Sequence, residues 1–220
     1  MKALSVLLFS LFPLIGSVAA EPPEVVLFGD SIRISYQATV LETLKGKAKV
    51  WAPKENCRHS AFLLEHLEGW LEGRHPSVIH LNAGLHDMYI ERKTGKTRYS
   101  LEAYEQNLRA IFKKIKTLSD AKVVFALTTP VNEEWQARSE TYRRVVRRNV
   151  DVQRYNKKAR EVAEHFGVVV NDLHGVITHA GPDKVLRPTD GIHLSPDGAN
   201  LVGDAIAKVI QQQLSAVSDP

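Results

Sequence analysis

Three side chains of this sequence have the types needed for nucleophilic attack on an acyl group. Ser31 follows an apolar run and the pair Gly29-Asp30, and Asp190 stands three positions before His193. In such a set the histidine takes the proton of the serine hydroxyl, while the aspartate fixes the histidine tautomer and stabilises the imidazolium. Neither part is specific alone, because a serine after a strand often caps a helix and surface loops are rich in aspartate and histidine. The set has catalytic meaning only if the fold brings its members together.

Both segments carry the local signals of a turn that leads into a helix. Gly29 permits a tight turn before Ser31, and residues 32–44 are compatible with a helix whose first N–H groups can face an oxyanion. After His193, Ser195 has the type of a helix cap and Pro196 suits the first helical position. The sequence therefore predicts that each candidate lies at the start of a helix.

The elements that position these residues follow from hydropathy. Short, nearly continuous apolar runs rich in β-branched residues are typical of strands buried on both faces of a parallel sheet. They cover residues 25–28, 49–52, 77–81, 122–127 and 168–170. Amphipathic stretches predict helices over residues 61–71, 101–115, 151–165 and 199–214. The alternation predicts one α/β domain, a three-layer α/β/α sandwich around a parallel five-stranded sheet.

In an open parallel sheet, ligands bind beyond the carboxyl ends of the strands. The candidates are then the polar residues that directly follow the apolar runs: Asp30, Ser31, Asn56, those within 82–87, Thr128, Thr129, Asn171 and Asp172. Hydropathy alone therefore includes Ser31 in the predicted site.

The combined motifs resemble the sequence blocks of the SGNH (GDSL-like) hydrolase family, in order and spacing over essentially all of residues 21–220. The motifs in chain order are Gly29-Asp30-Ser31, Gly84-Leu85-His86-Asp87 and Asp190-Gly191-Ile192-His193. The middle one is similar to the family's third block, usually Gly-x-Asn-Asp, in a variant with histidine. The resemblance implies a flavodoxin-like sheet and ester hydrolysis through an acyl-enzyme without a cofactor. It implies that Ser31 is the nucleophile, His193 the base and Asp190 the residue that orients the base.

Two positions depart from the family pattern, and both concern the oxyanion hole. The second block normally supplies a glycine N–H, but here Arg58 stands about at that place. Either the backbone N–H of Arg58 or the side-chain amide of Asn56 is a candidate donor. The third block, which Gly84 opens, has His86 where the family has asparagine, and an imidazole N–H can also donate to an oxyanion.

Other polar residues are expected to have supporting roles. Asp30 braces the turn before Ser31, and Asp87 holds a loop through hydrogen bonds to backbone N–H groups. Asn82 either braces a turn or enters the pocket. Cys57, the single cysteine, is expected to be a buried small side chain. No histidine pair has the spacing of a zinc site, so no metal is expected.

Residues 1–20 have the pattern of a secretory signal peptide: a basic start, an apolar stretch and the small residues Val18-Ala19-Ala20. The stretch is shorter than the roughly 20 residues of a membrane-spanning helix and contains Pro13 and Gly16. We expect cleavage after about Ala20, a secreted or periplasmic protein, and no stable membrane insertion afterwards.

The formal net charge is +4, and much of the basic excess lies within residues 138–160. A solvated helix face is the favoured interpretation of this basic segment, and attraction to an acidic polymer is the alternative. No nucleic-acid-binding module accompanies it, so nucleic acid is not an expected partner.

The expected substrate is a small-molecule or glycan ester. The segment after Asp87 is polar and contains Glu91, Arg92, Lys93, Lys96 and Arg98, which favours a small acyl group such as acetyl on a carbohydrate or similar polar alcohol. A lipase or lysophospholipase, and a non-catalytic carbohydrate-binding relative, are the alternatives. No feature of the sequence indicates an oligomeric state.

Overall fold

Five strands follow the predicted apolar runs. In the computed structural model, which describes residues 21–218, they are β1 (Glu24–Phe28), β2 (Lys49–Trp51), β3 (Val78–Asn82), β5 (Lys122–Ala126) and β7 (Val169–Asn171). All neighbouring strands pair in parallel, in the order β2-β1-β3-β5-β7. Every residue of β3 is buried, which explains its continuous apolar run. The predicted α/β fold with a parallel five-stranded sheet is confirmed.

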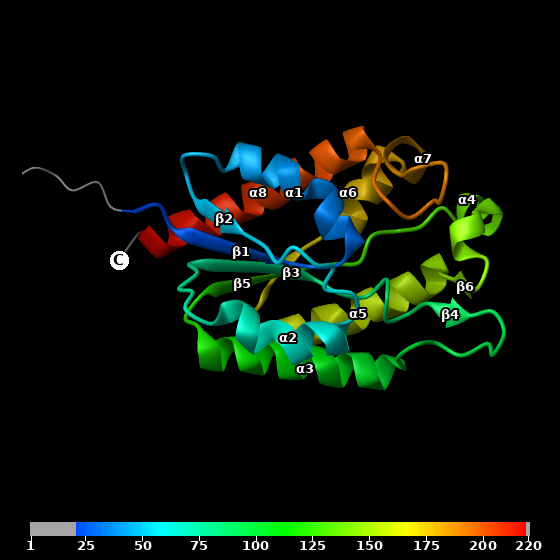
Figure 1. The fold of residues 1–220 in the computed structure, drawn as a ribbon, viewed down its shortest axis with the longest axis horizontal. Coiled ribbons are helices and arrows are strands. Elements are labelled where there is room, and N and C mark those ends of the chain that lie inside the picture. Colours follow the sequence, from blue (N-terminus) through cyan, green and yellow to red (C-terminus); the bar gives the residue numbers. More distant parts are fainter. Residues whose placement is uncertain (1–20, 219–220) are drawn as a thin grey trace, which may run out of the picture.

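Helices cover both faces of this sheet (Figure 1). On one face lie α1 (Ser31–Thr43), α6 (Leu173–Ala180), the short α7 (Pro182–Val185) and α8 (Pro196–Ser218). On the other lie α2 (Ser60–Leu71), α3 (Leu101–Leu118) and α5 (Asn149–Phe166). Each layer buries its own apolar cluster against the sheet. In α3, for example, Tyr104, Leu108 and Ile111 recur at helical spacing and are fully buried.

Four short elements beyond the carboxyl edge of the sheet were not predicted from the sequence. They are β4 (Ile90–Glu91), α4 (Glu133–Arg138), the 3₁₀ turn η1 (Glu140–Tyr142) and β6 (Val145–Val146). Strands β4 and β6 form an antiparallel pair, with Ile90 opposite Val146.

For its first half, the prediction of a helix face over residues 138–160 is therefore wrong. Only α5, from Asn149 onward, is helical with a solvated charged face; the residues before it turn and pair as a strand. The reason is tertiary, since the β-branched pair Val145–Val146 pairs with the distant strand β4. The many basic residues on both sides of Val145–Val146 led sequence analysis to treat the whole segment as a charged helix.

The topology brings the candidate segments to one edge. The strand order reverses between β1 and β3, so the loops after these two strands diverge and leave a crevice between them. Helix α8 packs on α1 closely, because Gly203 faces Thr39 and Tyr36 with no side chain of its own. The start of α8 is thereby held near the start of α1. Among residues 21–218, no helix combines the length and apolar character needed to cross a bilayer. The predicted signal peptide, residues 1–20, lies outside the described residues.

Candidate active site

Ser31 is the first residue of α1, directly after the turn that leaves β1. The helix cap is Asp30, whose Oδ1 accepts hydrogen bonds from the Ile32 backbone N–H at 3.0 Å and from Asn82 Nδ2 at 3.0 Å. Gly29 is required before it, because a Cβ there would overlap the Asn82 side chain. These hydrogen bonds of Asp30 brace the turn before Ser31, and Asn82 braces the same turn. Because Asp30 caps α1, the Ser31 hydroxyl is not needed as a helix cap.

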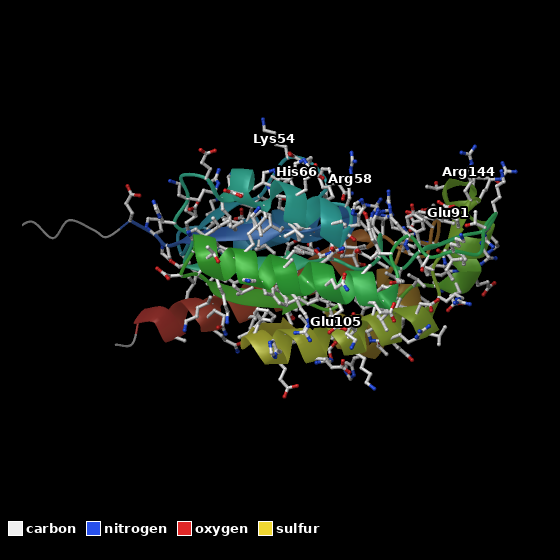
Figure 2. The ribbon with its side chains drawn as sticks, turned by 90° about the horizontal axis from the view of Figure 1, so that it is seen from below. Lys54, Arg58, His66, Glu91, Glu105 and Arg144 are labelled. Carbon is white, nitrogen blue, oxygen red and sulfur yellow. The ribbon has the colours of Figure 1, made fainter. Side chains whose placement is uncertain are left out.

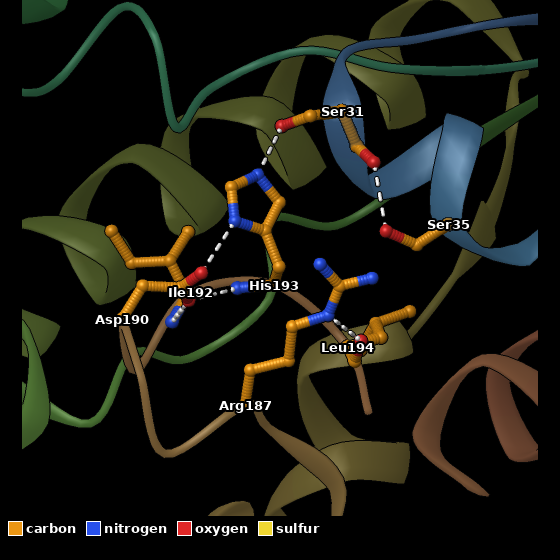
Figure 3. Close-up of polar contacts among 7 residues, drawn as sticks. All are labelled: Ser31, Ser35, Arg187, Asp190, Ile192, His193 and Leu194. Atoms are coloured by element: carbon orange, nitrogen blue, oxygen red, sulfur yellow. Dashed lines mark hydrogen bonds and ion pairs between the residues drawn. The ribbon is translucent and has the colours of Figure 1, made fainter. Parts of the chain in front are cut away.

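The three members of the set form one hydrogen-bonded chain, with His193 between Ser31 and Asp190 (Figure 3). His193 Nε2 is 2.9 Å from Ser31 Oγ, and His193 Nδ1 is 2.9 Å from Asp190 Oδ2. Ser31 and His193 are 162 positions apart in the chain. The fold therefore joins the three residues into a continuous carboxylate–imidazole–hydroxyl relay.

The loop that carries Asp190 and His193 is held by its own hydrogen bonds. Asp190 Oδ1 accepts from the backbone N–H groups of Ile192, at 2.8 Å, and His193, at 2.9 Å. Ser195 caps α8 by accepting from the Gly198 N–H at 3.1 Å, as predicted. One carboxylate thus shapes the loop with one oxygen and orients the imidazole with the other.

These contacts also keep Asp190 ionised. Burial acts to raise its pKa, but the hydrogen bonds from the backbone and ring of His193 and from the Ile192 N–H outweigh burial. The pKa of Asp190 is consequently held below its ordinary value. A carboxylate in this state stabilises a positive charge on the neighbouring imidazole.

The loop before α2 contains the two candidates of the altered second block. Arg58 has φ +54°, the left-handed conformation usually taken by glycine, which fits its place in the family pattern. Its backbone N–H, however, donates to Asn56 Oδ1 at 2.7 Å. Sequence analysis gave this N–H as a candidate oxyanion donor, but in the structure it donates its hydrogen bond within its own loop. The side-chain amide nitrogen of Asn56 makes no hydrogen bond to any residue within 21–218, so of the two candidates it is the one free to donate to an oxyanion.

The loop of residues 84–87 follows β3 and is anchored at both ends. Gly84 packs against Thr128, where a Cβ would overlap the threonine hydroxyl. Asp87 is fully buried and accepts from the backbone N–H of Ser60 at 3.1 Å and from the Ser60 hydroxyl. These hydrogen bonds hold the loop after β3 to the start of α2. Burial raises the pKa of Asp87 to about 7, against the lowering effect of the Ser60 hydrogen bonds.

His86 lies between these anchors and is half-buried. Burial lowers the pKa of His86, and the positive charges of Arg147 and Arg98 and the His193 ring act in the same direction, while Asp30 opposes them. The imidazole is therefore neutral near pH 7. A neutral imidazole has one ring N–H that can donate a hydrogen bond.

Arg147 is the residue that sequence analysis missed. Although an arginine, it is only 4% exposed, and its Nε donates to the Leu85 carbonyl at 2.7 Å, next to His86. Its guanidinium carbon lies 5.6 Å from the ring centre of Tyr89 and 5.0 Å from that of Tyr142. Its Nη1 is buried without a hydrogen-bond partner among the described residues. The only signal in the sequence is the apolar pair immediately before it, which the surrounding basic residues conceal.

Helix α4 links Arg147 to the second catalytic loop. The Gln136 side chain exchanges two hydrogen bonds with the backbone of Arg147, at 2.8 and 2.9 Å. At the other end of α4, the Asn132 N–H donates to the Gly191 carbonyl at 2.7 Å. The α4–β6 segment therefore connects the loop of residues 190–193 to the loop of residues 84–87.

Cys57 is buried, and burial raises the pKa of its thiol to about 11. Its backbone N–H donates to the Gly29 carbonyl at 3.0 Å, so the residue packs under the serine turn. The thiol is protonated and enclosed, as expected for a small core side chain.

Comparison with known proteins supports this chemistry. Residues 27–201 match the model of the GDSL-like Lipase/Acylhydrolase family. The chain is 26% identical to GDSL esterase/lipase CPRD49 of Arabidopsis thaliana, over 89% of this chain and 81% of that protein. It is 25% identical to the isoamyl acetate-hydrolyzing esterase 1 homolog of Bos taurus, over 89% of this chain and 84% of that protein.

Solved structures show the same fold. A lipase/acylhydrolase from Enterococcus faecalis superposes with a TM-score of 0.71 and 20% identity, covering 87% of this chain and 96% of that one. The acetyl xylan esterase AlAXEase superposes with a TM-score of 0.69 and 19% identity, covering 85% and 99%. Because the family model spans most of the sequence, the chain belongs to the GDSL-like lipase/acylhydrolase (SGNH) family and is a carboxylic ester hydrolase.

Proposed function

We propose that this esterase removes a small acyl group, acetyl above all, from a carbohydrate or a similar polar alcohol, with Ser31 as nucleophile. The observation that carries the proposal is the unbroken relay from Asp190 through His193 to Ser31, with 2.9 Å at each step. A serine hydroxyl is a weak nucleophile unless an adjacent base removes its proton. His193 is the base at that distance, and Asp190 fixes its orientation.

The reaction has two halves. Ser31 Oγ attacks the acyl carbon as His193 Nε2 takes the hydroxyl proton, and the tetrahedral intermediate collapses when His193 returns that proton to the leaving alcohol. Water then attacks the acyl-enzyme, again with His193 as base, and the acid leaves. Asp190 stabilises the imidazolium in both halves without accepting its proton.

The negative charge on the carbonyl oxygen requires donors on the side away from His193. We assign this oxyanion-donor role to three groups: the backbone N–H of Ser31 at the start of α1, the side-chain amide of Asn56 and the ring N–H of His86. Each lies on a loop at the carboxyl edge of the sheet, after β1, β2 and β3 respectively. His86 thereby serves where relatives have an asparagine amide.

The surroundings of the relay favour a polar substrate. Arg58 and Arg187 are exposed at this edge, and Asn56 and His86 are half-buried beside it. The segment 91–98 is exposed except for half-buried Thr97 and is mostly polar. A long acyl chain binds better to an apolar rim. Two structural neighbours, at 19% and 17% identity, are acetyl xylan esterases, which supports the same substrate class.

The leader-like residues 1–20 support export of this activity to the cell surface, the periplasm or the medium. Polymeric carbohydrate esters are substrates that an exported enzyme meets.

Hydrolysis of p-nitrophenyl acetate by the mature protein and by Ser31→Ala tests the nucleophile. We expect kcat to fall by about 10⁴-fold or more, because removal of a triad serine leaves only binding and oxyanion stabilisation. An unchanged melting temperature is the control that the fold is intact. Activity retained by Ser31→Ala would refute the assignment.

The acyl group is tested by comparing p-nitrophenyl esters of two to sixteen carbons, together with acetate release from acetylated xylan. We expect the highest kcat/KM on acetate and release of acetate from the polymer. A strong preference for the long chains would instead indicate a lipase or lysophospholipase.

A further inference from the structure

A basic groove lies at the end of the molecule that carries β4 and β6. It has a volume of about 630 Å³ and is lined by Glu91, Arg92, Lys93, Arg143, Arg144 and Val145. Figure 2 shows Glu91 and Arg144 at this same end of the molecule. Four of the six lining residues are cations and one is an anion. The volume is in the range of pockets that bind small molecules or a few sugar units.

Backbone pairing brings these like charges together. In the β4–β6 ladder Glu91 lies opposite Val145, and the Arg92 N–H donates to the Arg144 carbonyl at 2.9 Å. The two arginines are therefore neighbours across the pair. Like charges in such positions repel and destabilise a sheet, so their placement serves no stabilising purpose in the domain itself.

Most of this charge is not neutralised by the protein. Within residues 21–218, no carboxylate lies within salt-bridge distance of Arg92, Lys93 or Arg144. Arg143 contacts Glu140 at 2.7 Å, but both side chains are more than 70% exposed, so the pair is weak. The groove consequently presents a positive field to solvent.

The groove is connected to the catalytic centre by one short segment. Tyr142 precedes Arg143, and the buried Arg147, which stacks on Tyr142, donates to the Leu85 carbonyl beside His86. Arg144 and Arg147 are three positions apart along the chain, which corresponds to about 10 Å of extended backbone. The groove is thus connected through Arg147 to the loop of residues 84–87 at the carboxyl edge of the sheet, the edge at which Ser31 lies, and a polymer seated in the groove can extend toward that edge.

We propose that the groove over β4 and β6 is a subsite for an acidic polysaccharide, binding carboxylate-bearing sugars while an acyl ester on the same chain enters the catalytic centre. The planar guanidinium of arginine binds carboxylates through two parallel hydrogen bonds, which suits Arg92 and Arg144 to uronate groups. This subsite rests on the proposed function, since it selects the polymer that the esterase deacylates.

Binding is tested separately from catalysis, in the Ser31→Ala background. The probes are O-acetylated polygalacturonate and neutral acetylated xylan of matched acetyl content, titrated by calorimetry. We expect polygalacturonate to bind at least 10-fold more tightly than xylan at low salt, with the advantage lost at high ionic strength because exposed charges are screened. Equal binding of the two polymers would overturn the proposal.

Arg92→Gln/Arg144→Gln locates the subsite, and Lys45→Gln/Lys47→Gln is the matched control. The control removes the same charge from exposed lysines before β2, at the opposite edge of the sheet. We expect about a 10-fold loss of polygalacturonate affinity in the first variant and less than twofold in the second. Equal losses would overturn the proposal, since net charge alone would then explain binding.

With Ser31 intact, Arg92→Gln/Arg144→Gln should hydrolyse p-nitrophenyl acetate at the wild-type rate while losing kcat/KM on the acidic polymer. A wild-type protein inactive on every ester would count against the proposed function. The calorimetric titrations in the Ser31→Ala background test the subsite independently of catalysis.

Discussion

At the scale of single residues, a neutral imidazole and a carboxylate serve two different purposes in neighbouring loops. Asp190 is kept ionised by hydrogen bonds from its own loop, as a partner for an imidazolium requires. His86 is kept neutral by burial and by the positive charge of Arg147 and Arg98. The environment of each group therefore matches the protonation state that its proposed role requires.

The proposed role of His86 as an oxyanion donor predicts the effects of two substitutions. His86→Ala should lower kcat on p-nitrophenyl acetate by about 10²-fold with a small effect on KM, since loss of one donor acts on the transition state. His86→Asn should retain more activity than His86→Ala, because an amide N–H can donate from nearly the same place. Steady-state kinetics of both variants, with melting temperatures as the folding control, checks this. A wild-type rate in His86→Ala would leave His86 a structural residue.

At the scale of elements, the α4–β6 segment joins the loop of residues 84–87 to the loop of residues 190–193, which are far apart in the chain. Before α4, the Asn132 N–H donates a hydrogen bond to the Gly191 carbonyl. After β6, Arg147 Nε donates one to the Leu85 carbonyl. Gly191 has φ +67°, and a Cβ there would overlap the Asn132 carbonyl. The relay geometry thus depends on close contact between a six-residue helix and a glycine.

Gly191→Ala should therefore lower kcat by about 10-fold or more, because a displacement of His193 of about 1 Å is enough for a large loss of rate. Gly46→Ala is the matched control. Gly46 also has a positive φ, +74°, but nothing lies within 4 Å of its would-be Cβ. Its substitution should cost about 1 kcal/mol in the free energy of unfolding and leave kcat unchanged. Equal kcat in the two variants would show that α4 does not position the loop.

At the scale of the whole molecule, the buried Asp87 makes the stability of the domain depend on pH. It ties the loop after β3 to the start of α2, and Asn107 Nδ2 donates to the same Ser60 hydroxyl at 2.9 Å from α3. The folded state retains the Asp87 proton up to a pKa of about 7, whereas an unfolded aspartate releases it near 3.8. The stabilisation from this group is complete below pH 4 and is lost as the pH rises toward about 7.

Asp87→Asn should remove this dependence. The free-energy advantage of the wild type over the variant should be larger at pH 4.5 than at pH 8, by roughly 1 kcal/mol or more. Urea denaturation of both proteins at the two pH values measures it. A constant difference between wild type and variant would show that Asp87 titrates alike in the folded and unfolded states.

Much of this architecture was predictable because its signals are local. Continuous apolar runs, helical spacing and the cap Ser195 depend on a few adjacent residues, and all of them predicted elements that the structure contains. The motifs around Ser31, Asp190 and His193 likewise belong to short segments. The sequence by itself therefore determined the layers, the order of the main elements, the family and the residues to test.

The tertiary structure alone decided how these segments meet. The 2.9 Å contact between Ser31 and His193 depends on the packing of α1 against α8. The burial of Arg147 depends on the Leu85 carbonyl and the Tyr89 ring, which belong to a distant segment. The basic groove exists because β4 pairs with β6. These are long-range contacts, and hydropathy and charge along the chain do not specify which distant partner a polar group finds.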